Sequence, residues 1–209
     1  SLRNLRPKKK EGFLKIISIF SFLGIALGVA VLIIVMSVMN GFRSELITKI
    51  VGFNPHLIIS SFNNDLVNKN LENSEIKSLT ENFLYTNNGE AIITQKNFNK
   101  GLLLRGYNQN DFKKLPFVNN ENFNGNVKIL PNKISIGREL SFLLEVQIGD
   151  KVSILSPSGV QTLVGNLPKQ KTFIVGSIYE SGLLEFDQNV IFLNILDLED
   201  FFNYGVDDR

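Results

Sequence analysis

The longest uncharged stretch of the chain, Ile16–Phe42, limits the possible fold more than any other feature. Its 27 residues contain no Asp, Glu, Lys or Arg and end in the sequence SVMNGF. A helix of this length reaches about 40 Å, against a hydrocarbon core of about 30 Å. A cleaved signal peptide has an apolar region of about 7–15 residues that ends in small residues, and this stretch matches neither property. We therefore predict a retained membrane-spanning helix.

The charges on either side of this stretch predict its orientation. Residues 1–15 carry six basic side chains and one acidic side chain, a net charge of +5, so the overall +2 leaves −3 for the remainder. Because basic flanks stay in the cytoplasm, we expect residues 1–15 to form a cytoplasmic basic segment. Everything after Phe42 then lies on the far side of the membrane, which in a diderm bacterium is the periplasm. The slightly acidic remainder argues against a nucleic-acid partner, which needs clustered Lys and Arg.

The helical pattern continues beyond the apolar stretch. Residues 43–51 keep apolar side chains four residues apart and place Glu45 four residues before Lys49, as amphipathic helices do. Gly52 suits a helix C-cap, and Pro55 prevents the helix from resuming. We predict one unit over residues 16–53, a transmembrane helix continued by a stalk that docks on the following domain.

Two features of this helix predict contact with protein or ligand instead of bare lipid. Gly24 and Gly28 form a G-x-x-x-G motif, a spacing that lets a second helix approach closely. Near the far end, Asn40 lies among the long side chains of Met36 and Met39. A flexible thioether adapts its shape to varied partners. We predict helix packing at the two glycines and ligand contact near Asn40.

Residues 54–209 predict a separate α+β domain that is large enough for its own core. The sequence starts at Ser1 and stops after Arg209 without a terminating element, so we expect part of a longer protein and a domain incomplete at its C-terminus. From alternation and turn residues, strands are expected at 56–61, 89–95, 100–107, 150–155, 171–179 and 189–195. Helices are expected from 73 or 74 to 83, at 111–115, within 135–146, and at 195–202 with Asn194 as N-cap.

One loop stands out, the hairpin segment Ser156–Gln170. It carries no charge from Ser156 to Pro168 although it lies between two strong strand patterns. An exposed apolar loop marks a contact surface, and free strand edges can pair with a partner. The same pattern also fits a loop that folds back on its own domain.

The sequence predicts no catalytic or metal site. It has one His and no Cys, so a His- or Cys-based metal cluster is not expected. It also lacks the G-x-S-x-G and G-x-x-x-x-G-K-[ST] motifs of hydrolases and P-loop ATPases. Glu180, Glu185 and Asp187 are close in sequence, as acid–base pairs can be. Because they lie between two strands, we expect solvated turn charges.

At this level of detail the chain resembles a known family. From Leu2 to Ile59 it combines an LR-x-x-R…GF run, LGIALGV, SVMNGF, an E-L pair and a G-x-x-PH turn, and a second block runs from SIGREL to DLEDFF (135–202). Residues 62–131 match only in outline. This combination of motifs is similar to the LolC/LolE family of lipoprotein-releasing permeases. That family belongs to the Type VII ABC systems, a group that also contains MacB and FtsX. The resemblance implies four membrane helices, of which this chain carries the first, followed by most of a MacB-like periplasmic domain.

The resemblance also implies a function and its sites. A permease of this family extracts lipoproteins from the inner membrane and passes them to a periplasmic LolA-like carrier. Its partners are a second permease subunit and a LolD-like ATPase, which binds ATP and Mg²⁺, so the permease itself is not an enzyme and needs no cofactor. Cargo contact is implied at Val38, Met39, Asn40 and Phe42. Carrier capture by a hook is implied at Thr162, Leu163, Val164, Gly165, Leu167 and Pro168, although several polar and Pro positions of the hook differ from the family pattern.

Two alternatives remain open from the sequence. One is another MacB- or FtsX-type permease that transmits ATP-driven motion to a different partner. The other is a binding domain anchored by a single membrane span, without a role in transport. SVMNGF and the long uncharged hairpin segment favour lipoprotein release, and the continuous stalk argues against a simple tether.

Overall fold

The computed structural model describes residues 12–53, 57–59, 78–80, 82–96, 98–162 and 165–204, with backbone only at 48–53, 158–162 and 165–167. The chain divides into two compact units, residues 1–48 and 49–209. Most of the predicted basic segment, residues 1–15, lies outside the described residues. His56, the one histidine, also lies outside them.

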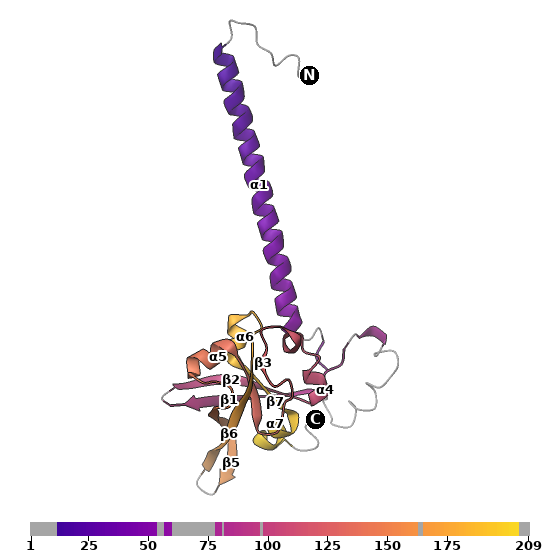
Figure 1. Cartoon of the computed structure of the whole chain (residues 1–209), viewed down its shortest axis with the longest axis vertical. Helices are drawn as coiled ribbons and strands as arrows, with labels where there is room; N and C mark the ends of the chain where they lie inside the picture. The colour runs from indigo at the N-terminus through magenta and orange to yellow at the C-terminus, as the bar shows by residue number, and fades with distance from the viewer. Residues whose placement is uncertain are drawn as a thin grey trace. The chain divides into compact units, whose positions relative to one another are not determined.

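A single long helix, α1 (Gly12–Phe53), makes up the first unit and passes without a break through SVMNGF (Figure 1). Its apolar side chains from Phe13 to Phe42 are all exposed. Within Gly12–Ile47, an 18-residue stretch reaches a mean hydropathy of 2.9, and this is the one helix in the described part of the chain that is long and apolar enough to cross a membrane. The helix continues through residues 43–53 as predicted, whereas their role as a stalk that docks on the following domain stays a prediction.

The second unit is built around a closed ring of strands. Along the sheet the order is β3-β6-β4-β7-β2-β1-β5, and β5 also pairs with β6, so six strands form a barrel with β3 beside it. The β2–β7 and β4–β6 pairs are parallel and the others are antiparallel. The strands are β1 (Thr86–Gln95), β2 (Phe98–Tyr107), β3 (Asn124–Gly125), β4 (Lys133–Gly137), β5 (Lys151–Thr162), β6 (Gly165–Tyr179) and β7 (Val190–Asn194).

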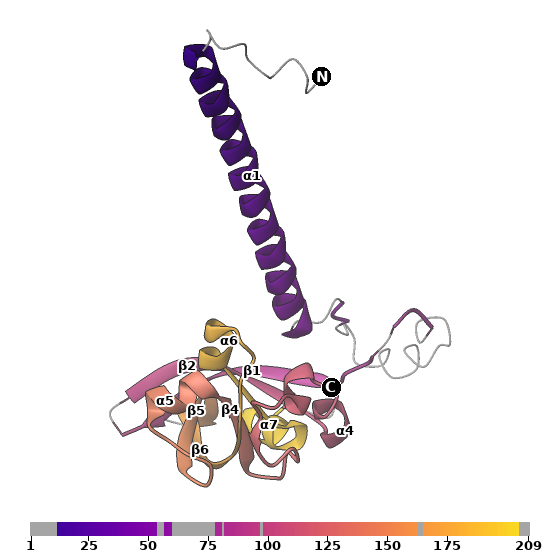
Figure 2. The same ribbon diagram turned by 45° about the horizontal axis from the view of Figure 1, so that its top comes forward.

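Short helices cover the barrel (Figure 2). They are α4 (Gln109–Phe112), the 3-10 helix η2 (Pro116–Asn119), α5 (Arg138–Leu144), α6 (Leu184–Asn189) and α7 (Ile195–Phe202). The predicted N-cap of the last helix is confirmed, because Asn194 Oδ1 accepts a hydrogen bond from Leu196 N at 3.0 Å. In both views α5 and α6 lie near each other and α7 lies away from them.

Two apolar clusters hold this unit together. The first fills the barrel and includes Ile93, Leu104 and Phe173, with α7 packed onto it through Phe201. The second is aromatic and lies under α4 and η2, where the Phe117 ring is 4.8 Å from Tyr179 and 4.9 Å from Phe192. Strand β7, buried at Val190–Leu193, lies between β4 and β2, and its run of four apolar residues is typical of a strand covered on both faces.

The α+β class with one N-terminal apolar helix is confirmed, but three local predictions are wrong. Residues 57–59 of the predicted strand 56–61 have no regular structure, and its other residues lie outside the described part. Of the predicted helix ending at Phe83, Ser78 and Leu79 are helical, yet Asn82 and Phe83 are not. Where a turn was expected after Glu180, the helix α6 forms.

Candidate functional site

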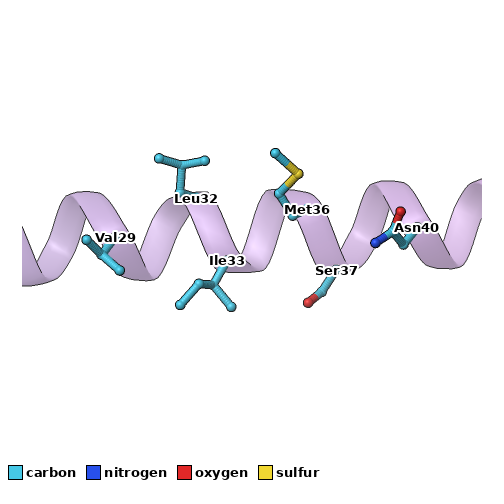
Figure 3. A pocket seen from close by; sticks show the side chains of 6 residues that line it. All are labelled: Val29, Leu32, Ile33, Met36, Ser37 and Asn40. Atoms are coloured by element: carbon cyan, nitrogen blue, oxygen red, sulfur yellow. The ribbon is translucent and has the colours of Figure 1, made fainter.

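One face of α1 carries a shallow groove. It is lined by Val29, Leu32, Ile33, Met36, Ser37 and Asn40. Figure 3 shows these side chains along the helix, with the Ser37 hydroxyl and the Asn40 amide at one end and aliphatic groups at the other. The spacing of three and four residues places all six on one side of the helix. The groove is therefore apolar along most of its length and polar toward the stalk.

The predicted cargo residues do not all share this face. All four side chains are exposed, and Asn40 belongs to the groove. Val38 is two residues away, about 200° around the helix. Phe42 lies 18 residues, or about five full turns, after Gly24, so these two residues are on the same side of the helix. Val38 is about one turn before Phe42 and Gly28 about one turn after Gly24, so both lie on this side too. Met39 lies about 20° from Leu32, at the edge of the groove.

The hairpin segment forms the outer part of β5 and β6. The two strands pair antiparallel from Lys151↔Ile174 outward to Thr162↔Gly165, with a register shift between Ser156 and Val160. The shift falls at Pro157 and Gly159, residues that are typical of bulges. In Figure 1 the paired ends of β5 and β6 project from the domain. The segment is thus a protruding hairpin and does not fold back on the barrel.

The hook residues lie at the tip of this hairpin. Thr162 and Gly165 are paired there, and Leu167 lies opposite Val160. Leu163 and Val164 lie outside the described residues, and the side chain of Pro168 is exposed. The four described positions are therefore close together along the hairpin, at its end farthest from the barrel.

Of the three carboxylates after β6, Asp187 departs from the expectation of solvated turn charges. Glu180 forms an ion pair with Arg138 at 2.7 Å, and Glu185 is exposed. Asp187 is 2% exposed, and its two carboxylate oxygens accept hydrogen bonds from Ser181 N at 2.9 and 3.2 Å. Burial raises the pKa of Asp187, with a further rise from Glu180, while the hydrogen bonds from Ser181 lower it.

A fully buried tyrosine completes this corner of the domain. The Tyr179 hydroxyl donates to Val190 O at 2.8 Å. Burial and the nearby Asp187 raise the pKa of Tyr179 well above its usual value. A neutral, hydrogen-bonded phenol and a carboxylate bound by a backbone amide hold α6 in place. In the described ranges, no group of three or more His, Cys, Asp or Glu side chains is arranged so that it could hold a metal ion.

Sequence reasoning missed the charged contacts at the base of the hairpin. Lys171 lies 3.1 Å from Asp197 and 3.3 Å from Asp200, both on α7. Lys169 donates to Asp200 O at 2.5 Å and to Asn203 Oδ1 at 2.9 Å. The one signal in the sequence was a pair of lysines two residues apart at the end of an uncharged segment. Their partners, two carboxylates for Lys171 and a carbonyl and an amide oxygen for Lys169, are about 30 residues further along the chain.

Comparison with known proteins gives a consistent result. No family model matches the chain. It is 32% identical over 204 residues to the lipoprotein-releasing system transmembrane protein LolC of Neisseria meningitidis serogroup B, covering 94% of this chain and 48% of that protein. For LolC of Haemophilus influenzae the identity is 32% over 212 residues, with 95% and 50% covered. For LolE of Haemophilus influenzae it is 30% over 169 residues, with 74% and 39% covered.

The chain spans about half the length of these LolC relatives. Within that half, the similarity extends over nearly the whole chain, from the apolar helix to the barrel. The resemblance inferred from SVMNGF and the second block is thereby confirmed. Over the half of those proteins that it spans, the chain belongs to the LolC/LolE family of lipoprotein-releasing system transmembrane proteins.

Proposed function

We propose that the chain is part of a permease subunit in an ATP-driven complex that releases lipoproteins from the bacterial inner membrane. The observation that carries this proposal is the similarity to LolC proteins over 94–95% of the chain. The structure supports it with a membrane-length helix joined directly to a helical stalk. In the proposed orientation residues 1–15 are cytoplasmic and the barrel is periplasmic, as the charge asymmetry predicts.

In this proposal α1 contacts the acylated cargo near its periplasmic end. Val38, Met39, Asn40 and Phe42 are the contact residues, and they occupy two sides of the helix. Cargo that touches all four therefore contacts α1 on more than one side. A neighbouring helix would pack against the Gly24–Gly28 side, because glycines allow backbones to approach closely. The exposed methionines Met36 and Met39 suit lipid chains of varied shape.

The hairpin is proposed to capture the periplasmic carrier. Its outer part combines the described hook positions with strand edges that, among the described residues, pair only within the hairpin, a combination that suits binding of another protein. LolC relatives match 94–95% of the chain, whereas the LolE relative matches 74%. This difference favours a LolC-type subunit, the type that captures the carrier, over a LolE-type subunit, which does not. ATP and Mg²⁺ are proposed to bind a separate ATPase subunit, and a second permease subunit completes the complex.

Site-specific photo-crosslinking in cells that express the full-length protein tests both contacts. A photoreactive residue at Leu163 or Leu167 is expected to crosslink to a periplasmic carrier. The same residue at Met39 or Asn40 is expected to crosslink to lipoprotein. Leu196, which is exposed on α7 (62%) but away from the hairpin tip, is the matched control and is expected to give neither product.

Each pattern of products has a definite meaning. Lipoprotein crosslinks at Met39 with none at the hairpin tip would retain lipoprotein release and assign the chain to the LolE type. The absence of both products from an assembled complex would overturn lipoprotein release. A permease of the MacB or FtsX type would then take its place.

A further inference from the structure

The base of the hairpin is fastened to one helix, α7. Three residues at alternate positions of β6 face this helix: Phe173, Lys171 and Lys169. The Phe173 ring meets Phe201 edge to face at 6.1 Å inside the barrel core. One step outward, Lys171 contacts the carboxylates of α7 and lies 5.2 Å from the Phe173 ring. The contact face of β6 thus continues beyond the core, with lysines in place of apolar residues.

These lysine contacts have the geometry of specific interactions. The side chains of Lys171 and Asp197 are only 23% and 12% exposed, so water and salt screen the pair less than an exposed pair. Lys169 binds the C-terminal end of α7 through Asp200 O and Asn203 Oδ1. Carbonyls in the last turn of a helix lack helical partners, and a lysine both satisfies them and complements the negative end of the helix.

The helix itself is closely packed on the barrel. Any Cβ at Gly106 of β2 would lie 3.0 Å from the Cα of Ile195 and 3.1 Å from the Cβ of Leu198. A Cβ at Gly89 of β1 would collide with the ring of Phe202. Both glycines therefore allow α7 to approach the sheet more closely than any other residue would. A helix seated in this way is a rigid support for whatever binds to it.

The rest of the barrel offers the hairpin less support. In the described part of the chain, β1 pairs with β5 only as far as Leu155, and β4 pairs with β6 only from Ile174. From Ser156 to Lys169 the pairing of β5 and β6 is with each other. Two strands alone are marginally stable and flexible in water. The contacts of Lys169 and Lys171 with α7 lie where the hairpin leaves the barrel.

We propose that Lys171 and Lys169 are positioning residues, which fix the direction of the hairpin by binding α7. The consequence for carrier capture rests on the proposed function. A hairpin held in one direction presents its tip without the entropy cost of ordering it at each encounter. Loss of the lysine contacts is expected to leave the barrel folded, to widen the range of hairpin directions and to weaken capture.

The test uses distance measurements between two spin labels on the full-length protein in lipid nanodiscs. The chain described here has no cysteine, so labels can be placed at Gln161→Cys on the hairpin and Glu121→Cys on the barrel after any cysteines elsewhere in the full-length protein are replaced. A narrow distance distribution is expected for the parent protein. Lys171→Met, alone or with Lys169→Met, is expected to broaden or shift it. Lys96→Met is the matched control, because the Lys96–Glu145 pair has side chains 67% and 74% exposed and does not involve α7.

Rescue separates positioning from a loss of fold. Lys171→Arg, which keeps the positive charge beside Asp197 and Asp200, is expected to restore the narrow distribution. An unchanged distribution in the Lys169→Met, Lys171→Met double variant would overturn the proposal. In the variants that broaden the distribution, carrier crosslinking from Leu167 is expected to fall. The distances are measured without a carrier, so the two tests are independent. If the lysine variants broaden the distribution but the parent protein never crosslinks to a carrier, the proposed function is refuted and the positioning role of the lysines stands.

Discussion

The helix α1 and the barrel domain use apolar residues in opposite ways. Every large apolar side chain of α1 from Phe13 to Phe42 is exposed, whereas the barrel buries Ile93, Leu104, Phe173 and their neighbours almost completely. Both arrangements remove apolar surface from water only if a partner is present. The barrel supplies that partner from its own strands. The helix needs one from outside, and its length and hydropathy match a bilayer.

This difference teaches which mutations each region should tolerate. A barrel held by its own core is sensitive to lost volume, because neighbouring side chains cannot fill the gap. A helix surrounded by lipid is insensitive to volume but sensitive to charge. Each prediction below applies a change to one region and asks whether the other responds.

The largest effect is expected from Phe117→Ala in the aromatic cluster. Phe117 is 1% exposed and its ring contacts Tyr179 and Phe192. Its removal should lower the free energy of unfolding of the barrel by about 3–5 kcal/mol, as measured by pulse proteolysis in urea with α1 in detergent. Phe142→Ala is the control, since Phe142 is 68% exposed, and should change it by less than about 0.5 kcal/mol. Equal effects would contradict this account of the core.

The next effect is expected from Leu32→Lys in α1. A lysine near the centre of a membrane helix adds about 2.5–3.5 kcal/mol to the apparent free energy of insertion. A translocon insertion assay should show that rise, while urea unfolding of the barrel stays unchanged. Leu32→Ala is the control and should leave most molecules inserted, because the remaining span keeps its high hydropathy. A lysine variant that inserts like the parent would show that α1 does not meet lipid at this position.

The same contrast explains which features could be predicted from the sequence. The span, the strands β1, β2, β6 and β7, and the Asn194 cap depend on local patterns, and the structure has them near the expected residues. The pairing of Lys171 with Asp197 and the burial of Asp187 depend on contacts that the barrel closure creates. The neighbouring residues indicate neither the partner of Lys171 nor the burial of Asp187. The two faces of α1 follow from the spacing of its residues alone, but the sequence of a single helix does not indicate which partner covers each face.

A smaller effect is expected from Asn194→Ala at the start of α7. The Asn194 side chain accepts a hydrogen bond from Leu196 N, and loss of such a cap costs about 1 kcal/mol. The free energy of unfolding of the barrel should fall by this amount in the same urea assay, and the insertion of α1 should not change. Asn120→Ala, at an exposed position after η2, is the control. A loss as large as that of Phe117→Ala would mean that α7 unfolds as a whole without its cap.

The smallest effect is a pH dependence that α1 should lack. Burial raises the pKa of Asp187 in the folded barrel above its value in the unfolded chain. The folded state therefore binds this proton at a higher pH than the unfolded state does. The resulting stability is fully present below the unfolded pKa of about 3.9 and is lost as the pH rises through the folded pKa. Asp187→Asn removes this titration. As the pH falls from neutral, the free energy of unfolding of the parent should therefore rise relative to that of the variant.

Urea unfolding between neutral and mildly acidic pH measures this divergence. Glu185→Gln, at an exposed neighbour on α6, should follow the parent. If Asp187→Asn keeps a constant offset at every pH, the pKa of Asp187 is the same in the folded and unfolded states, and the hydrogen bonds from Ser181 balance the effect of burial.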